Sequence, residues 1–304
     1  MTIFGCDVHP QYQAGLSIEQ VRAEGFDFLA VKVSEGTGTF GGLDWIRRGQ
    51  ACGLLSLGYH YLRSGDEVAQ AAVFCQQLAA AGGVPGMLDA EAITAVGQTP
   101  TLTVAGIHRF LDACASNGAR VPLMYLPRWY WQRMGSPDLS GLPTLWASSY
   151  VAGTGYASVL YEAVTPSAWA AYGGLPVSVL QFTDRALVAG QRIDADAFPG
   201  TRDDFTNLLG PNNPPPTPPP SPDPGPSSIP QVEYGQTNDT VLHLQAFMNR
   251  VFPAYSHLPV TGFYGDLTVS VIKEFQRRLG IVGADGRNCG PVTTAKLWEA
   301  GFRG

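Results

Sequence analysis

The stretch Val84-Pro85-Gly86-Met87-Leu88-Asp89-Ala90-Glu91-Ala92-Ile93 predicts a short buried strand that carries two acidic side chains. An apolar run bounded by glycine-containing turns is typical of such a strand. Because side chains alternate between the two faces of a strand, Asp89 and Glu91 are expected on one face, with Cα atoms about 7 Å apart. Two facing buried carboxyl groups have separated pKa values, so one can donate a proton while the other stays charged. The alternative is an exposed strand end with two solvated acids.

Residues 1–209 around this stretch predict alternating strands and helices. Strands are expected at 3–8, 28–33, 54–61, 87–91, 121–126, 144–150, 177–182 and, as a short segment, near Ile193. Helices are expected at 18–24, 43–52, 66–81 and 102–115. This alternation predicts βαβ units and a parallel sheet, and about eight strands in one domain predict a closed α/β barrel. After Tyr125 the gaps shorten and become rich in Pro and Gly, so the last strands are expected to lack full crossover helices.

Acidic residues stand at the predicted ends of several strands. Asp7 ends the first, Glu35 follows the second, Asp89 and Glu91 close the fourth, and Asp194 lies in the last. Active sites of such barrels gather at the C-terminal ends of several strands. Each acid alone could be an ordinary loop residue, but only 14% of the side chains are charged. The sequence therefore predicts a site built from these acids.

Aromatic residues accompany the acids, and two interpretations stay open for them. The residues concerned are Tyr59, Tyr61, Tyr125, Trp129, Trp146 and Tyr150. Aromatic stripes usually belong to a hydrophobic core, whereas a cleft that holds sugar rings also needs flat aromatic faces beside its carboxylates.

Charge and cysteine content exclude some classes of function. Residues 1–209 hold 12 basic and 18 acidic side chains, which gives −6, and residues 231–304 hold 7 and 6, which gives +1. An acidic main domain argues against a nucleic-acid partner. The five cysteines are odd in number and form no Cys-x-x-Cys pair, so we expect reduced core residues, no disulfide framework, no zinc site and no cofactor.

The N-terminus, Met-Thr-Ile-Phe-Gly-Cys-Asp, has neither the basic nor the apolar region of a signal peptide. No run of about 18 apolar residues is present, so no membrane insertion is expected. We expect synthesis in a reducing cytoplasm.

Two further segments follow the main domain. Residues 210–230 are a predicted linker, because eleven of the twenty residues 211–230 are proline, which favours extended polyproline II. Residues 231–304 predict a module of three helices, with a weak repeat between Gly265-Asp266-Leu267-Thr268 and Gly290-Pro291-Val292-Thr293. The helices are expected around 241–251, 267–279 and 291–299.

The main domain resembles the lysozymes of glycoside hydrolase family 25. The matching stretches, in the order of the family, are Gly5-Cys6-Asp7-Val8, the Lys-x-Ser-Glu-Gly-Thr of 32–37, Gly58-Tyr59-His60-Tyr61, Leu88-Asp89-Ala90-Glu91, Leu145-Trp146-Ala147, Leu180-Gln181-Phe182-Thr183 and Ile193-Asp194-Ala195-Asp196-Ala197-Phe198. The C-terminal module resembles the three-helix peptidoglycan-binding domain through Leu244-Gln245, the stretch 262–268, Phe275-Gln276 and Asp285-Gly286. Together the pair resembles a phage endolysin.

This resemblance implies an irregular TIM-like barrel, with five βα units and then strands with few helices, and a small all-α domain. It implies cleavage of the β-1,4 bond between N-acetylmuramic acid and N-acetylglucosamine. Glu91 would be the general acid and is expected to be protonated at working pH. Asp7, Asp89 and Asp194 would be the other catalytic carboxylates and are expected to be ionised. The implied substrate-binding residues are Lys32, Glu35, Tyr59, Tyr61, Tyr125, Trp146 and Gln181, with no metal or cofactor.

The sequence departs from the family pattern at three positions. His9 replaces the usual Ser, Leu180 the usual Trp and Asp196 the usual Asn. The last departure leaves Asp194 and Asp196 as competing candidates for the fourth carboxylate, with Asp194 preferred. Retention and inversion of the anomeric configuration both stay open.

Two other functions remain as alternatives: a zinc-dependent wall amidase or peptidase, and a non-catalytic wall-binding protein. The five histidines contain no His-Glu-x-x-His pattern, which argues against the first. The expected partners are peptidoglycan glycan strands, with the C-terminal module bound to the wall and the protein a monomer. A protein without a signal peptide would reach the wall from the host cytoplasm with the help of a holin-type partner, which the resemblance alone implies.

Overall fold

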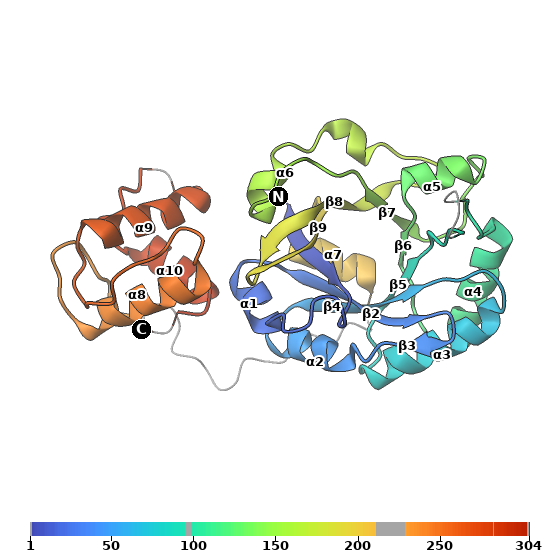
Figure 1. Ribbon diagram of the computed structural model, residues 1–304, viewed down its shortest axis with the longest axis horizontal. Coiled ribbons are helices and arrows are strands. Elements are labelled where there is room, and N and C mark those ends of the chain that lie inside the picture. Colours follow the sequence, from blue (N-terminus) through green and yellow to red (C-terminus); the bar gives the residue numbers. More distant parts are fainter. Residues whose placement is uncertain (1, 95–98, 211–228, 282, 303) are drawn as a thin grey trace. The chain divides into compact units, whose positions relative to one another are not determined.

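The computed structural model describes residues 2–94, 99–210, 229–281, 283–302 and 304. The chain divides into two compact units, one with all the strands and one with the last three helices (Figure 1). The predicted linker, 210–230, falls almost entirely on 211–228, outside the described residues. No helix in the described ranges has the length and apolar character needed to cross a membrane.

The first unit begins with five βα units, as the sequence predicts. Its elements are β1 (Ile3–Val8), α1 (Ile18–Ala23), β2 (Phe28–Glu35), β3 (Gly38–Thr39), α2 (Leu43–Ala51), β4 (Leu55–Tyr61), α3 (Glu67–Ala80), β5 (Gly86–Asp89), α4 (Val104–Ser116), β6 (Leu123–Tyr125), α5 (Arg128–Arg133), β7 (Thr144–Ser148), α6 (Ala157–Tyr161), the 3₁₀ helix η1 (Pro166–Trp169), β8 (Val177–Val188), β9 (Gln191–Phe198) and α7 (Arg202–Leu209). The helices become short after β6, which confirms the expected loss of crossover helices.

Eight of the described strands close into a barrel. Their order is β1-β9-β8-β7-β6-β5-β4-β2, and β2 pairs again with β1, while β3 only extends β2 as a hairpin. The predicted closed barrel is therefore confirmed, but the expectation of a parallel sheet fails at one strand. β9 runs antiparallel to both β8 and β1. A tight turn with positive φ at Ala189 and Gly190 joins β8 directly to β9. Such a turn reverses the chain, whereas a parallel arrangement would need a crossover connection.

Strand bounds differ from the expected ones at several strands. β6 is shorter, at Leu123–Tyr125, and β8 is longer, because it continues to Val188. β5 ends at Asp89 rather than Glu91, and only the amide of Ala90 continues the ladder, with a hydrogen bond to the carbonyl of Tyr125. The strand near Ile193 is eight residues long rather than short. It is part of a long β8–β9 hairpin whose pairing continues beyond the barrel wall.

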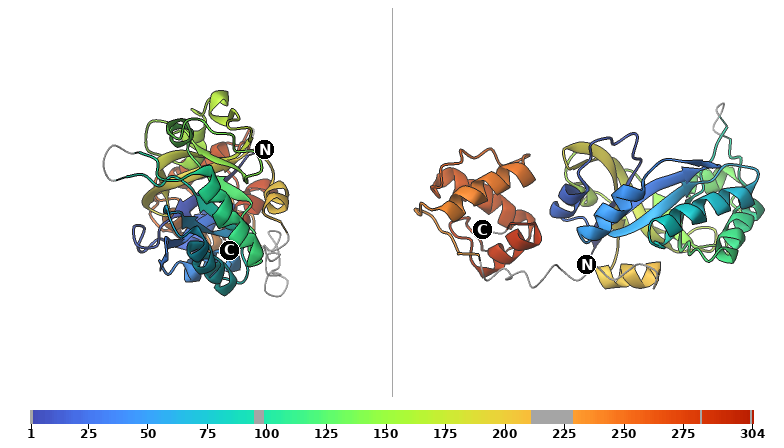
Figure 2. Two further views of the ribbon diagram at one scale, coloured as in Figure 1. Left: turned by 90° about the vertical axis from the view of Figure 1, so that its right-hand side faces the viewer. Right: turned by 90° about the horizontal axis from the view of Figure 1, so that it is seen from below.

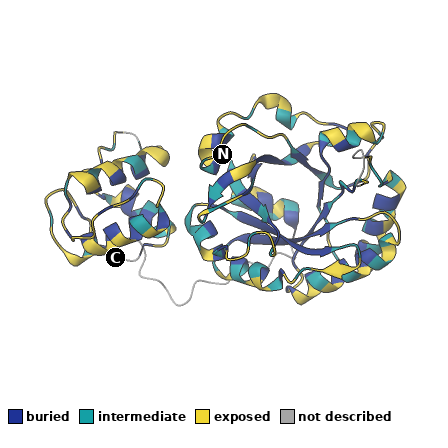
Figure 3. Cartoon of the chain, viewed as in Figure 1, coloured by how far each residue is buried: buried dark blue, intermediate teal, exposed yellow. Residues whose placement is uncertain are grey.

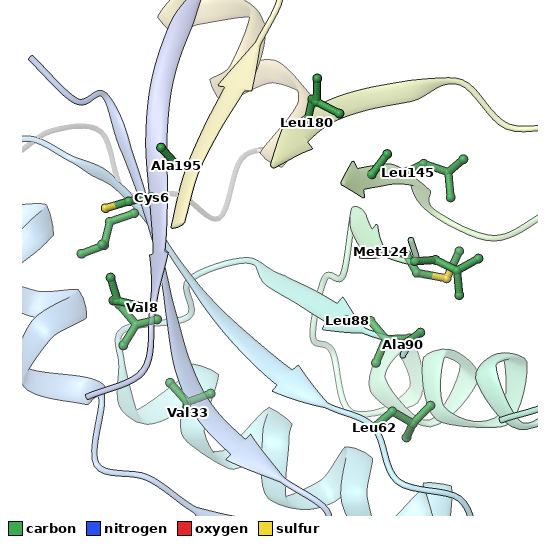
Figure 4. Close-up of a cluster of buried hydrophobic side chains, with 14 of the residues drawn as sticks. Cys6, Val8, Val33, Leu62, Leu88, Ala90, Met124, Leu145, Leu180 and Ala195 are labelled. Carbon is green, nitrogen blue, oxygen red and sulfur yellow. The ribbon is translucent and has the colours of Figure 1, made fainter. Parts of the chain in front are cut away.

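The outward faces of the strands form one apolar layer with the surrounding helices. Figure 4 shows side chains of this layer from several strands, among them Cys6, Val33, Leu88, Met124 and Leu180. The barrel strands are mostly buried, whereas the helices expose their outer faces (Figure 3). This layer uses alternate residues of each strand, so the remaining residues face the barrel interior.

The interior is apolar at the N-terminal ends of the strands. Ile3, Phe28, Leu55 and Phe198 lie in one buried cluster there, which also includes Phe205 and Leu209 of α7. Helix α7 lies at one end of the barrel (Figure 2). Helix α7 begins at a capping box in which Thr201 and Asp204 bond each other's backbone amides. This end of the barrel is therefore closed, and polar inward side chains appear only toward the C-terminal ends.

The second unit contains α8 (Asp239–Val251), α9 (Asp266–Arg278) and α10 (Pro291–Glu299) around one apolar core, as predicted. The repeat noticed in the sequence corresponds to a repeated contact. Gln245 donates to Thr268 Oγ1 at 2.9 Å, and Gln276 donates to Thr293 Oγ1 at 2.9 Å. Each Gln thus fixes the start of the next helix through a buried threonine.

All five cysteines are described, and all are free thiols. Cys52 is half-buried and the other four are buried, which confirms their prediction as reduced core residues.

Candidate active site

Inward side chains at the C-terminal ends of the strands line a cavity of about 220 Å³. Its wall consists of Asp7, His9, Tyr12, Gln13, Lys32, Tyr59, Met87, Asp89, Glu91, Tyr125, Tyr150, Gln181 and Asp194. On β5 the alternation is complete, because Leu88 and Ala90 lie in the outer apolar layer while Asp89 and Glu91 line the cavity.

The four predicted catalytic acids come together in this cavity. Asp7 on β1 lies directly opposite Asp194 on the antiparallel β9. Asp89 ends β5, and Glu91 follows two residues later. Burial removes these carboxyl groups from water, which disfavours their charged forms.

Burial raises the pKa of every one of these acids. The pKa of Asp7 rises to about 6, with bonds from Gln181 and Asp196 opposing the rise, and that of Glu91 rises to about 7, helped by the charge of Asp7. The pKa of Asp194 rises to about 8 for the same reason, with Asp7 as the nearest charge. The pKa of Asp89 lies well above its usual range because of burial and the neighbouring Glu91.

A protonated Glu91 agrees with the sequence-based expectation, but three ionised aspartates do not. Asp89 and Asp194 also favour the protonated form near neutral pH. The cause is desolvation, which the spacing of acids along a strand does not reveal. One oxygen of Asp89, Oδ1, is buried without a hydrogen-bond partner.

Gln181 on β8 connects Asp7 with two tyrosines. Its Nε2 donates to Asp7 Oδ2 at 2.7 Å, and its Oε1 accepts from the hydroxyls of Tyr125 at 2.9 Å and Tyr150 at 2.6 Å. Two donors on Oε1 fix the orientation of the amide, so the amide nitrogen faces Asp7. The predicted roles of Gln181 and Tyr125 at the cavity are consistent with this arrangement.

Asp196 lies beneath the cavity wall and is fully buried. Its Oδ1 accepts a hydrogen bond of 2.9 Å from the indole nitrogen of Trp146, while Asp194 lines the cavity itself. This placement favours Asp194 over Asp196 as the fourth carboxylate. It also corrects the assignment of Trp146 to substrate binding, because this side chain is 0% exposed in the barrel interior.

Lys32 supplies a positive charge to the acidic wall. Its Nζ lies 2.5 Å from Glu35 Oε2 and within about 5 Å of the ring centroids of Phe40 and Tyr61. Glu35 also binds Arg63. Glu35 and Tyr61, both predicted to bind substrate, therefore stand behind Lys32 and outside the cavity wall, where they fix the position of its ammonium group.

Several cavity residues were not assigned from the sequence. Tyr12, Gln13 and Met87 carried no signal, while His9 was noted only as a departure and Tyr150 only as an aromatic at a strand end. Met87 could have been found, because it precedes Asp89 by two residues and therefore shares its face. In the described ranges, no group of three or more His, Cys, Asp or Glu side chains is arranged to hold a metal ion.

Comparison with known proteins identifies both units. The sequence model described as Glycosyl hydrolases family 25 matches residues 7–190, and that described as Putative peptidoglycan binding domain matches residues 237–297. No curated protein matches the chain significantly.

The barrel is also similar to solved structures. A muramidase from Trichobolus zukalii is 23% identical with a TM-score of 0.55, over 68% of this chain and 98% of that one. A family GH25 lysozyme from Aspergillus fumigatus is 22% identical with a TM-score of 0.55, over 69% and 100%. A bacterial lysozyme from Streptomyces coelicolor is 20% identical with a TM-score of 0.53, over 68% and 96%. These structures share the fold, and the family match covers more than half of the chain: this protein belongs to glycosyl hydrolases family 25.

Proposed function

We propose that the chain is an endolysin-type muramidase that hydrolyses the β-1,4 bond between N-acetylmuramic acid and N-acetylglucosamine in bacterial peptidoglycan. The observation that carries the proposal is the meeting of Asp7, Asp89, Glu91 and Asp194 in one cavity at the C-terminal ends of the barrel strands. Membership of the family narrows the reaction to hydrolysis of a glycosidic bond. The peptidoglycan-binding match indicates the polymer, and the names muramidase and lysozyme of the similar structures agree with it.

Glu91 is the general acid in this proposal. Glycoside hydrolysis needs a protonated carboxyl group beside the leaving oxygen and negative charge near the oxocarbenium-like centre. A pKa of about 7 keeps about half of the Glu91 side chains protonated at neutral pH while leaving the group acidic enough to donate. Its position beyond the end of β5 leaves it less buried than Asp89, as a group that must meet substrate requires.

Asp89 orients the N-acetyl group of the substrate. Its Oδ1 has no hydrogen-bond partner, and in this proposal the acetamido N–H supplies one. A hydrogen bond to the carboxylate favours its charged form, so binding of the sugar lowers the pKa of Asp89 and leaves the shared proton on Glu91. The ammonium group of Lys32 lowers the pKa of Asp89 in the same direction.

The reaction then follows in two steps. Glu91 transfers its proton to the bridging oxygen as the bond from that oxygen to the anomeric carbon breaks. The acetamido oxygen, held by Asp89, bonds to the anomeric carbon and forms an oxazolinium ion. Water attacks this carbon, the bond to the acetamido oxygen breaks, and the proton of the water returns to Glu91. Asp7, held by Gln181, and Asp194 face the positive charge that develops in both steps.

Mass spectrometry of digested peptidoglycan tests the reaction class. A muramidase releases fragments with reducing N-acetylmuramic acid ends. Free stem peptides would instead indicate the amidase or peptidase alternative, and an undigested wall would indicate the binding protein. Proton NMR that finds the β-anomer as first product supports the retaining route, and the α-anomer would exclude it.

The C-terminal unit acts as a wall anchor that raises the local concentration of the enzyme at an insoluble substrate. Deletion of residues 211–304 is expected to weaken adsorption to cell walls more than it changes hydrolysis of soluble fragments. The endolysin role places the action on the wall after release through a holin-type partner, and co-expression with such a pore-forming protein tests it by timing lysis.

A further inference from the structure

We propose that Tyr12 is a stacking platform for a hexopyranose ring of the glycan strand, next to the sugar pair whose bond is cleaved. This inference rests on the proposed function, because it extends the same cavity along the polymer. Tyr12 belongs to the loop between β1 and α1 and lines the cavity, yet it is 80% exposed, the most exposed of the large apolar side chains in the described residues.

The ring of Tyr12 is held in place by a buried neighbour. It stacks on the imidazole of His9 with a centroid distance of 4.1 Å and an interplanar angle of 27°. His9 is 7% exposed and also contacts the ring of Phe40, edge to face, at 4.9 Å. One face of Tyr12 is therefore covered by protein, and the other is presented to solvent at the mouth of the cavity.

The loop that carries Tyr12 is fixed by its own hydrogen bonds. The amides of Tyr12 and Gln13 both donate to the carbonyl of His9, at 2.9 and 3.1 Å. The His9 amide donates to Gln13 Oε1 at 2.7 Å, and Nδ1 of His9 accepts from the amide of Gln11 at 3.2 Å. The exposed ring is thus preorganised, so a ligand that covers it loses little conformational freedom from the protein side.

The chemistry of the neighbourhood selects a sugar as the ligand. A hexopyranose offers a face of C–H groups, and the negative face of an aromatic ring attracts such groups. The rest of the cavity wall consists mainly of carboxyl, hydroxyl and amide groups, which suit sugar hydroxyls and acetamido groups. An apolar peptide or lipid would leave these polar groups without partners.

The barrel topology indicates the direction in which a bound glycan runs across the cavity mouth. β1 and β5 stand three strands apart in the ring of eight, so the loop of Tyr12 after β1 and the acids Asp89 and Glu91 at the end of β5 lie at different parts of the mouth. A glycan whose cleaved bond lies at Glu91 has to extend across the mouth to reach Tyr12. Tyr12 then contacts a sugar beyond the pair at the cleaved bond.

Three substitutions in the full chain test whether binding depends on the flat aromatic ring of Tyr12 or only on the size of its side chain. They are Tyr12→Phe, Tyr12→Leu and Tyr12→Ala. The substrates are soluble glycans of alternating N-acetylglucosamine and N-acetylmuramic acid, four and eight sugars long. We expect Tyr12→Ala and Tyr12→Leu to raise KM for the octasaccharide by about three- to tenfold, with kcat unchanged within about twofold. Tyr12→Phe keeps both constants, and the tetrasaccharide is less affected in every variant.

Two results would overturn the inference: wild-type kinetics in Tyr12→Ala, or Tyr12→Leu that behaves like Tyr12→Phe. A loss of kcat in Tyr12→Ala at unchanged KM would also overturn it, because the loop would then serve the structure of the site. If wild-type protein releases no reducing ends, the proposed function fails separately. Titration of the octasaccharide into wild type and Tyr12→Ala then decides the platform alone, with a Tyr12-dependent affinity in support and equal affinities against it.

Discussion

The two units of the chain treat their buried polar side chains in opposite ways. In the C-terminal unit Gln245 uses both amide hydrogens and accepts twice at its oxygen, so its bonding capacity is filled. In the barrel cavity Asp89 leaves one buried oxygen without a partner, and the pKa values of all four acids are raised. Polar groups that are satisfied stabilise a fold, whereas buried groups left short of partners hold free energy that a ligand can recover.

Among the acids of the cavity, the largest expected effect comes from removing the proton donor, Glu91. Glu91→Gln keeps the size of the side chain but cannot donate in the same way, so hydrolysis of cell walls should fall by about 10²–10⁴-fold. Adsorption to walls and the melting temperature should stay as in the wild type. Glu162→Gln, an exposed acid outside the cavity, is the matched control and should keep full activity. Turnover by Glu91→Gln at the wild-type rate would exclude Glu91 as the acid.

In the C-terminal unit, removing a buried, hydrogen-bonded glutamine should lower stability rather than activity. Gln276→Ala leaves two buried groups, the amide of Gly286 and the hydroxyl of Thr293, without their partner and also removes a bond to the carbonyl of Asn288. The free energy of unfolding of the C-terminal unit should fall by about 2–4 kcal/mol, measured by urea titration. Gln231→Ala replaces an exposed glutamine of the same unit and should change little. Equal stabilities of the two variants would show that the buried network is not what holds the unit together.

A change of pH should act on the cavity acids first. Because the pKa of Glu91 is about 7, hydrolysis of soluble fragments should decline by about tenfold per pH unit well above that value, as the proton donor is lost. Binding of Glu91→Gln to walls serves as the control and should not follow the same curve. A rate that stays constant to pH 9 would contradict the raised pKa of the general acid.

The smallest effect is a gain in stability at the cost of function. The pKa of Asp194 is about 8 in the folded chain and near 3.8 in the unfolded chain, so the folded state is destabilised progressively as the pH rises from about 4 to 8. Asp194→Asn removes this penalty and should stabilise the barrel by about 1–2 kcal/mol at pH 8, with the gain vanishing near pH 4. Asp112→Asn, at an exposed position, should show no such trend in thermal unfolding. A constant difference across this range would rule out the linkage.

Much of the barrel could be predicted because the pattern of each strand was local. β1 has the expected bounds, and the first four helices lie within two residues of the expected ones. The direction of β9 was not predictable in the same way, because hydrophobic periodicity is the same in parallel and antiparallel strands. Only the turn at Ala189-Gly190 distinguishes the two, and a strand expected to be short gave no reason to consider a hairpin.

The sequence predicted which face of its strand a site residue occupies, but not how far along the barrel axis its side chain lies. Alternation correctly placed Asp89 and Glu91 on the same inward face, and Gln181 and Tyr125, which the family resemblance implied, also line the cavity. The same rule places Trp146 inward, yet its side chain lies too far down the barrel axis to reach the cavity. Depth depends on how the strands are staggered around the ring, and no single strand carries that information. Tyr12 was missed because its exposure follows from a loop whose fold depends on His9.

Helix α7 gives the barrel a floor, because Phe205 and Leu209 fill the interior opposite the cavity. Because one end of the barrel is closed, a polymer cannot pass through it along its axis. A glycan substrate must bind across the open end of the barrel, be cleaved at an internal bond and dissociate from the same end. The attacking water has to arrive at that same end, so departure of the first fragment sets when the second half of the reaction can begin.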